Sequence, residues 1–223
     1  MNTNMIQIIV LAGIALFLVL QLRRVLGTRD GFEQKPDQID PNAPAQRRAA
    51  GNFDVIEGGG IDHDIADFVD IKSDTGKALA AMKKIEPSFS VAEFAGGARQ
   101  AYEMILMAFE NGDVDTLRDF LSPDVFEGFR SAVDARAEQG LTVDANFVGV
   151  RELKIVEAAF DEENKEAEIT LRFAGELTSA VKDSEGRIVE GDPNEIKRQR
   201  DIWTFARLMG TDNPNWLLVA TEN

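Results

Sequence analysis

The side chains that usually perform catalysis are scarce in this sequence. Cysteine is absent, and His63 is the only histidine. Ser–His–Asp and Cys–His catalysis each require a histidine, so both are excluded except beside His63, and thiolate metal sites are excluded outright. Asp62 and Asp64 flank His63, and carboxylates beside an imidazole are familiar metal ligands. Three adjacent side chains on a helix point in different directions, however, so we expect no metal site here.

Motifs for phosphate binding and for acid–base chemistry are also missing or incomplete. Gly58-Gly59-Gly60 is followed by Ile61, not by the lysine of a phosphate-binding loop. Tyr102 is the only tyrosine, and its spacing from neighbouring apolar residues places it on a core face. The sequence therefore predicts a non-catalytic protein that holds no cofactor.

The charge balance argues against nucleic-acid binding. The chain has 24 basic and 39 acidic residues among 223, a formal net charge of −15 at pH 7. Phosphate backbones are bound by clustered Lys and Arg, which a polyanion does not offer. Anionic lipid would also repel this chain, so any contact with a bilayer must come from hydrophobic insertion.

One acidic segment has the pattern of a docking motif. Ile61, Ile65, Phe68 and Val69 fall at i, i+4, i+7 and i+8, one face of a helix, and aspartates occupy much of the rest. An amphipathic helix of this kind can lay its apolar face into a partner's groove. Two alternatives stay open: the segment packs on its own domain, or it is a solvated stretch.

The N-terminal region predicts a membrane anchor. Residues 5–22 are apolar apart from Gln7 and Gln21. Eighteen helical residues rise about 27 Å, close to the ~30 Å hydrocarbon core of a bilayer. A cleaved signal peptide is the alternative, but no basic residue precedes the apolar run and no small-residue cleavage site follows it.

Basic residues after the apolar run predict its orientation. Arg23, Arg24 and Arg29 follow it, and no basic side chain precedes it. The positive-inside rule then places Arg23 and Arg24 at the cytoplasmic membrane boundary. We expect a single-pass protein of the bacterial inner membrane with a cytoplasmic C-terminal domain.

Composition divides the rest of the chain into a tether and a domain. Residues 23–72 include three prolines and the glycine triplet, which predicts a flexible tether containing the acidic segment. Residues 73–223 carry regular apolar periods. Helices are predicted over 74–84, from Ser88 or Ser90 to about Glu110, after Asp113, and from Ser122 to near Gly140.

From Asn146 the apolar period changes from helical to two. Leu153 and Ile155 alternate, and the phase then slips to Val156, which predicts a β-bulge. Further strands are predicted over 167–173, 196–209 and 216–221, with polar turns at 161–165 and 183–187. Helices followed by an antiparallel meander predict an α+β cone, with helices on one face of a curved sheet and often a hydrophobic pocket inside.

Taken in order, these features resemble the Tim44-like domain family, and the bacterial, TimA-type members in particular. The resemblance covers nearly the whole sequence. It rests on the anchor with Arg23-Arg24, the tether, the stretch 94–109 with Glu110-Asn111-Gly112-Asp113 after it, the Leu121-Ser122-Pro123 joint, Trp203-Thr204-Phe205 and Trp216. The family implies a nuclear-transport-factor-like cone, inner-membrane attachment on the matrix or cytoplasmic side, and an adaptor role. The mitochondrial adaptor tethers a heat-shock chaperone of the seventy-kilodalton class to the import channel.

We therefore expect a membrane-anchored, non-catalytic adaptor. Its partners would be a protein, with a chaperone or a translocase as candidates, and the lipid bilayer through the N-terminal helix. A spanning helix and a short linker distinguish this sequence from the mitochondrial form. Two alternatives remain: a structural scaffold of a secretion complex with a periplasmic domain, and a pocket-containing binder of a small molecule or lipid.

Overall fold

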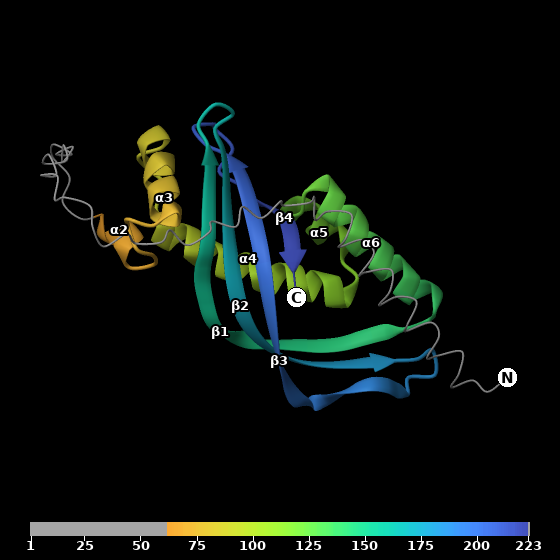
Figure 1. Ribbon diagram of the computed structural model, residues 1–223. Coiled ribbons are helices and arrows are strands. Elements are labelled where there is room, and N and C mark those ends of the chain that lie inside the picture. The colour runs from red at the N-terminus through yellow and green to blue at the C-terminus, as the bar shows by residue number, and fades with distance from the viewer. Residues whose placement is uncertain (1–61, 223) are drawn as a thin grey trace, which may run out of the picture. The chain divides into compact units, whose positions relative to one another are not determined.

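The computed structural model describes residues 62–222, which form helices followed by an antiparallel sheet (Figure 1). The predicted α+β class is thereby confirmed. Within residues 62–222, no helix combines the length and apolarity needed to cross a bilayer. The predicted membrane helix 5–22, Arg23 and Arg24, Ile61 and most of the tether lie outside the described residues.

The four longer helices begin and end close to where local signals predict, whereas the helical period expected over residues 61–69 gives a helix only at His63–Ala66 among the described residues. Helix α2 spans His63–Ala66, α3 spans Asp74–Ile85, α4 spans Val91–Asn111, α5 spans Val114–Phe120 and α6 spans Pro123–Glu138. Ser73, Ser90 and Asp113 cap three of them by accepting a hydrogen bond from a backbone N–H of the first turn. Helix α4 ends at Gly112, whose φ of 71° is left-handed and suits glycine.

Four antiparallel strands form one sheet in the order β1-β2-β3-β4. Strand β1 spans Thr142–Asp161, β2 spans Glu166–Lys182, β3 spans Ile188–Leu208 and β4 spans Leu217–Glu222. Both predicted turns are hairpins. Strand β3 begins eight residues earlier than predicted, at Ile188 instead of Ile196. Residues 188–195 have no apolar alternation that would predict a strand. They are extended because they pair with β2, where Gly191 lies opposite Ala180.

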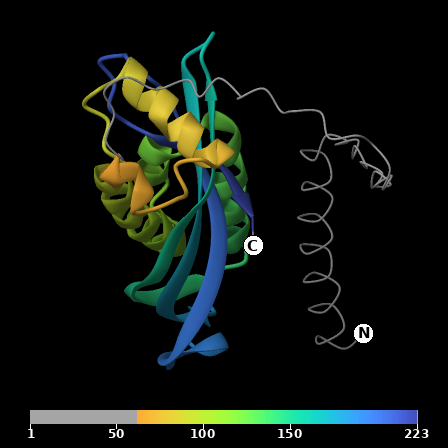
Figure 2. The same ribbon diagram turned by 60° about the vertical axis from the view of Figure 1, so that its left-hand side comes forward.

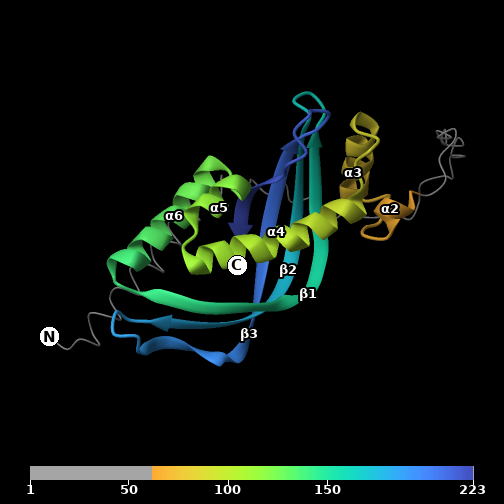
Figure 3. The ribbon, with the colours of Figure 1, turned by 180° about the vertical axis from the view of Figure 1, so that it is seen from behind.

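Bulges bend the sheet. Strand β1 shifts register against β2 between Phe147 and Gly149, between Val150 and Glu152, and between Ile155 and Glu157. The last shift confirms the slip predicted near Val156. Figures 1 and 3 show the result: the three long strands turn sharply, and α4 crosses one of the two limbs.

Tyr102 of α4 lies at the centre of the contact between helix and sheet. Its ring stacks on Phe173 of β2 with centroids 4.4 Å apart and planes 8° from parallel. The ring of Trp203 in β3 also contacts Tyr102, and the two ring centroids are 4.7 Å apart. Tyr102 and Phe173 are both 0% exposed, so a helix and two strands share one aromatic cluster.

Gly175 makes room for that ring. A methyl group at position 175 would lie 2.7 Å from the Tyr102 hydroxyl and 2.9 Å from Cε1. The ring cannot move aside easily, because Phe173 and Trp203 hold it.

We predict that Gly175→Ala lowers the free energy of unfolding by about 1–3 kcal/mol, since it overpacks a buried contact. Urea unfolding of the purified chain measures the change. Gly128→Ala is the matched control, because a methyl group in the middle of α6 meets nothing within 4 Å and should stabilise the helix by about 0.5–1 kcal/mol. Equal stability of Gly175→Ala and the wild type would contradict this account of the core.

Candidate functional site

The segment that precedes α3 folds back onto the domain. Asp62 caps α2, its Oδ1 accepting a hydrogen bond of 3.1 Å from the Asp64 N–H. Ile65 is 2% exposed and belongs to the hydrophobic core, while Phe68 and Val69 are half-buried against it. Figure 2 shows α2 close to α3 and to the beginning of α4.

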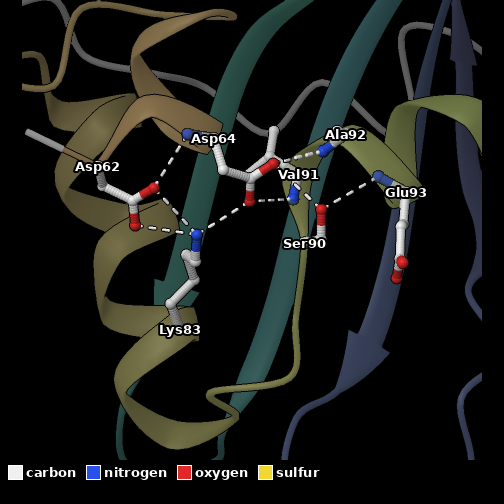
Figure 4. A network of polar contacts seen from close by, with 7 residues as sticks. All are labelled: Asp62, Asp64, Lys83, Ser90, Val91, Ala92 and Glu93. Atoms are coloured by element: carbon white, nitrogen blue, oxygen red, sulfur yellow. Dashed lines mark hydrogen bonds and ion pairs between the residues drawn. The ribbon is translucent and has the colours of Figure 1, made fainter.

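Asp64 connects this segment to the first turn of α4. Its carboxylate accepts hydrogen bonds from the N–H groups of Val91 and Ala92, at 2.8 and 2.9 Å (Figure 4). The Ser90 hydroxyl donates to it at 3.1 Å, and the Lys83 ammonium of α3 lies 2.9 Å away. A carboxylate at this position satisfies backbone donors that a helix N-terminus leaves unpaired and suits the positive end of the helix dipole.

Lys83 is shared between two carboxylates. Its Nζ is 2.9 Å from an Asp62 oxygen as well as from Asp64. Burial alone would lower the pKa of Lys83, but hydrogen bonds and charge from Asp62 and Asp64 outweigh it and raise the pKa. The lysine is therefore charged across the physiological range.

The same contacts lower the pKa of Asp64. Partial burial alone would raise the pKa, but hydrogen bonds from Lys83, Ala92, Val91 and Ser90 lower it from 3.8 to about 2. A folded-state pKa below the unfolded value means that the contact stabilises the fold above pH 3.8 and loses this contribution as the pH falls toward 2.

The predicted docking residues thus lie against their own domain. Ile65, Phe68 and Val69 face the core, which is the arrangement that the alternative interpretation expected. Ile61 lies outside the described residues. Docking of these side chains to a partner stays a prediction, and it requires the segment to leave the surface on which it is folded. Asp62 and Asp64 both contact Lys83, and His63 is exposed beside them.

A second polar cluster lies between α4 and strand β3 of the sheet. The Tyr102 hydroxyl donates to Asp201 Oδ2, and the Gln199 amide donates to the same oxygen at 2.9 Å. Burial, followed by the hydrogen bond and charge of Asp201, raises the pKa of Tyr102. A carboxylate and a phenol are acid–base groups, but here Tyr102 is 0% exposed and Asp201 is 7% exposed, and each satisfies the other.

Asp201 was not singled out from the sequence, although a signal for it exists. Asp201, Trp203 and Phe205 alternate along β3, so a carboxylate shares one face with two large aromatic residues. A lone acid on an apolar face needs a buried partner, and Tyr102 provides it. Tyr102 itself is confirmed as a core residue.

Hollows in the described part of the chain lie at the sheet surface. One of about 320 Å³ is lined by Glu152, Arg172, Phe173, Ala174 and Arg200. Charged side chains make up most of this lining. Another, of about 340 Å³, lies over the β1–β2 hairpin and is lined by Ala159, Phe160, Asp161, Glu166 and Glu168.

We predict that Asp64→Asn lowers the free energy of unfolding at pH 7 by on the order of 1 kcal/mol, because the partly exposed carboxylate is screened by solvent. The loss relative to wild type should shrink as the pH falls from about 4 toward about 2 and below, where the wild-type carboxyl becomes protonated as well. Urea unfolding at several pH values measures it. Asp67→Asn, in the same segment and exposed, should change stability by less than about 0.5 kcal/mol. A loss that does not depend on pH would contradict the role of the charge.

Comparisons with known proteins identify the family to which the domain is similar. A family model described as "Tim44-like domain" matches residues 75–223. TIM44-1 of Arabidopsis thaliana, a mitochondrial import inner membrane translocase subunit, is 23% identical over 141 residues, which are 63% of this chain and 29% of that protein. The human TIM44 subunit is 21% identical over 144 residues, 64% of this chain and 31% of that protein. The matched part is thus about a third of the length of these relatives.

Solved structures are less similar. The intermembrane space region of the chloroplast protein ARC6 matches with a TM-score of 0.40 and 12% identity, over 57% of this chain and 94% of that chain. The family match is the stronger finding, since it covers both the helices from α3 onward and the whole sheet. The chain belongs to the Tim44-like domain family.

Proposed function

We propose that this chain is a membrane-anchored, non-catalytic adaptor that holds a protein partner at the bacterial inner membrane. The observation that carries the proposal is the order of its parts. A domain of the family that includes mitochondrial import inner membrane translocase subunits follows an apolar run long enough to span a bilayer. A chaperone or a translocase component is the partner class that this relationship favours.

Anchoring gives a physical reason for such an arrangement. A domain tied to the membrane by a linker of a few tens of residues meets membrane-bound partners at an effective concentration of about millimolar. Weak contacts then suffice for binding. The net charge of −15 carried by the whole chain disfavours adhesion to anionic lipid, so the anchor and the linker set the position of the domain.

The buried polar groups of the domain support a role in binding and not in catalysis. Tyr102 and Asp201, the pair most similar to an acid–base catalyst, are hydrogen bonded to each other inside the core. Glu176 on β2 is held between Arg151 of β1 and Arg198 of β3, at 2.6 and 2.8 Å. Each set links neighbouring elements, which is the function of a structural contact.

Membrane topology is the first prediction to test, and the absence of cysteine makes it accessible. Asn2→Cys and Glu163→Cys place one thiol on either side of the apolar run, the second in the exposed β1–β2 turn. In spheroplasts, a membrane-impermeant maleimide should label Asn2→Cys at once and Glu163→Cys only after the membrane is permeabilised. The opposite pattern would place the domain in the periplasm and favour a secretion scaffold.

The docking role of residues 61–69 gives a separate prediction. A photo-crosslinking phenylalanine analogue at position 68 should link the full-length chain to another protein in cells, because the adaptor hypothesis requires this face to meet a partner. The same analogue at Phe160, half-buried at the far end of β1, is the control. Crosslinks confined to the chain itself at position 68 would contradict docking by this segment.

A further inference from the structure

The surface beneath α2 has the features of a peptide-binding site. Four groups converge on the Asp64 carboxylate: the Lys83 ammonium, the Ser90 hydroxyl and the N–H groups of Val91 and Ala92 (Figure 4). One residue further along the segment, the Ile65 side chain enters the core and is 2% exposed. Protein grooves commonly recognise amphipathic segments through charged hydrogen-bond donors next to a site for an apolar side chain.

The segment of residues 62–70 and the surface that it covers differ in whether the family model matches them. The family match begins at residue 75, so Lys83, Ser90, Val91 and Ala92 belong to the matched domain. Residues 62–70 precede the match. The segment therefore lies outside the residues that the family model matches, while the surface that it covers lies within them.

The occupant is held by few interactions of its own. Helix α2 has four residues, far fewer than an isolated helix needs to be stable in water. Its attachment depends on the ion pairs of Asp62 and Asp64 with Lys83, on the Asp64 hydrogen bonds, and on three apolar side chains. Short segments of this kind belong to the parts of a protein that open at the lowest free energy.

We propose that this surface is a binding site for an acidic amphipathic segment of a partner protein, and that residues 62–70 are its tethered, displaceable occupant. The site selects a carboxylate followed directly by an aliphatic side chain, with a second carboxylate two residues earlier to share Lys83. Basic segments are excluded, because they would place like charge on Lys83. The proposal rests on the adaptor function and assigns it a second contact.

Gly76 provides a way to open the site without altering its chemistry. A methyl group at position 76 would lie 2.4 Å from the Asp70 carbonyl oxygen and 2.7 Å from the Ile71 Cα. We therefore expect Gly76→Ala to displace the end of the segment from α3, while Lys83 and the first turn of α4 keep their side chains and backbone donors. Asp64→Asn opens the site independently, by removing the charge that Lys83 holds.

Fluorescence anisotropy of a labelled synthetic peptide of residues 61–72 tests the proposal. The full-length chain in detergent micelles is titrated with the peptide. Because the tethered occupant competes with the peptide, we expect the Asp64→Asn and Gly76→Ala chains to bind the peptide about fivefold more tightly than wild type.

Variants on the other side of the contact supply the controls. In the opened chains, Lys83→Glu should weaken peptide binding at least about tenfold, as should Asp64→Asn in the peptide itself. Lys84→Glu changes the neighbouring exposed lysine of α3 by the same charge and should leave binding within about twofold.

Three outcomes would overturn the proposal. The first is no binding by either opened chain when circular dichroism shows that its domain is folded at the assay temperature, and the second is peptide binding that Lys83→Glu leaves unchanged. The third is dimerisation of the opened chains through exchanged segments, which would make a second copy the occupant. None of these outcomes depends on topology, so a periplasmic domain would overturn the adaptor function and leave the peptide result intact.

Discussion

Helix α4 has to cross a sharply bent sheet, and the aromatic cluster around Tyr102 makes that crossing stable. The Tyr102 ring stacks in parallel on Phe173 and makes a tilted contact with Trp203. Because Gly175 has no side chain, the Tyr102 hydroxyl can approach the sheet. Aromatic pairs of this geometry contribute about 0.5–1.5 kcal/mol beyond the area they bury. The hydrogen bond to Asp201 fixes the helix along the strand direction, since a displaced helix would leave a buried carboxylate unpaired.

The position of α4 in turn fixes the ends of the domain. Its first turn presents the N–H groups that bind Asp64, so the segment of α2 can dock only where α4 begins. At the other end, Gly112 and Asp113 turn the chain into α5, and the α5–α6 joint meets β4 through the bond from the Ser122 N–H to the Leu218 carbonyl. Glu86, just after α3, is paired with Arg207 of β3, which ties the remaining helix to the sheet.

Polar contacts within the described domain join neighbouring elements. Tyr102 and Asp201 are hydrogen bonded to each other in the core, and the donors that face Asp64 hold the segment that precedes α3. The Asp64 carboxylate is partly exposed, whereas the Tyr102–Asp201 pair is buried beside aromatic rings. The match to the Tim44-like domain family covers Lys83, Ser90, Tyr102 and Asp201, which make these contacts.

The sequence by itself determined the secondary structure, the class and the family. Caps such as Ser90 and Asp113, the stop at Gly112 and the slip in apolar period near Val156 all act within a few residues, so they can be read along the chain. The tertiary structure alone decided the rest. Asp64 meets Val91 across 27 positions, and Tyr102 meets Asp201 across 99. The extension of β3 to Ile188 likewise depends on pairing with β2. The acidic segment shows the limit most clearly: its period revealed an apolar face, but only the folded domain decides what that face covers, because burial depends on which distant surface is within reach.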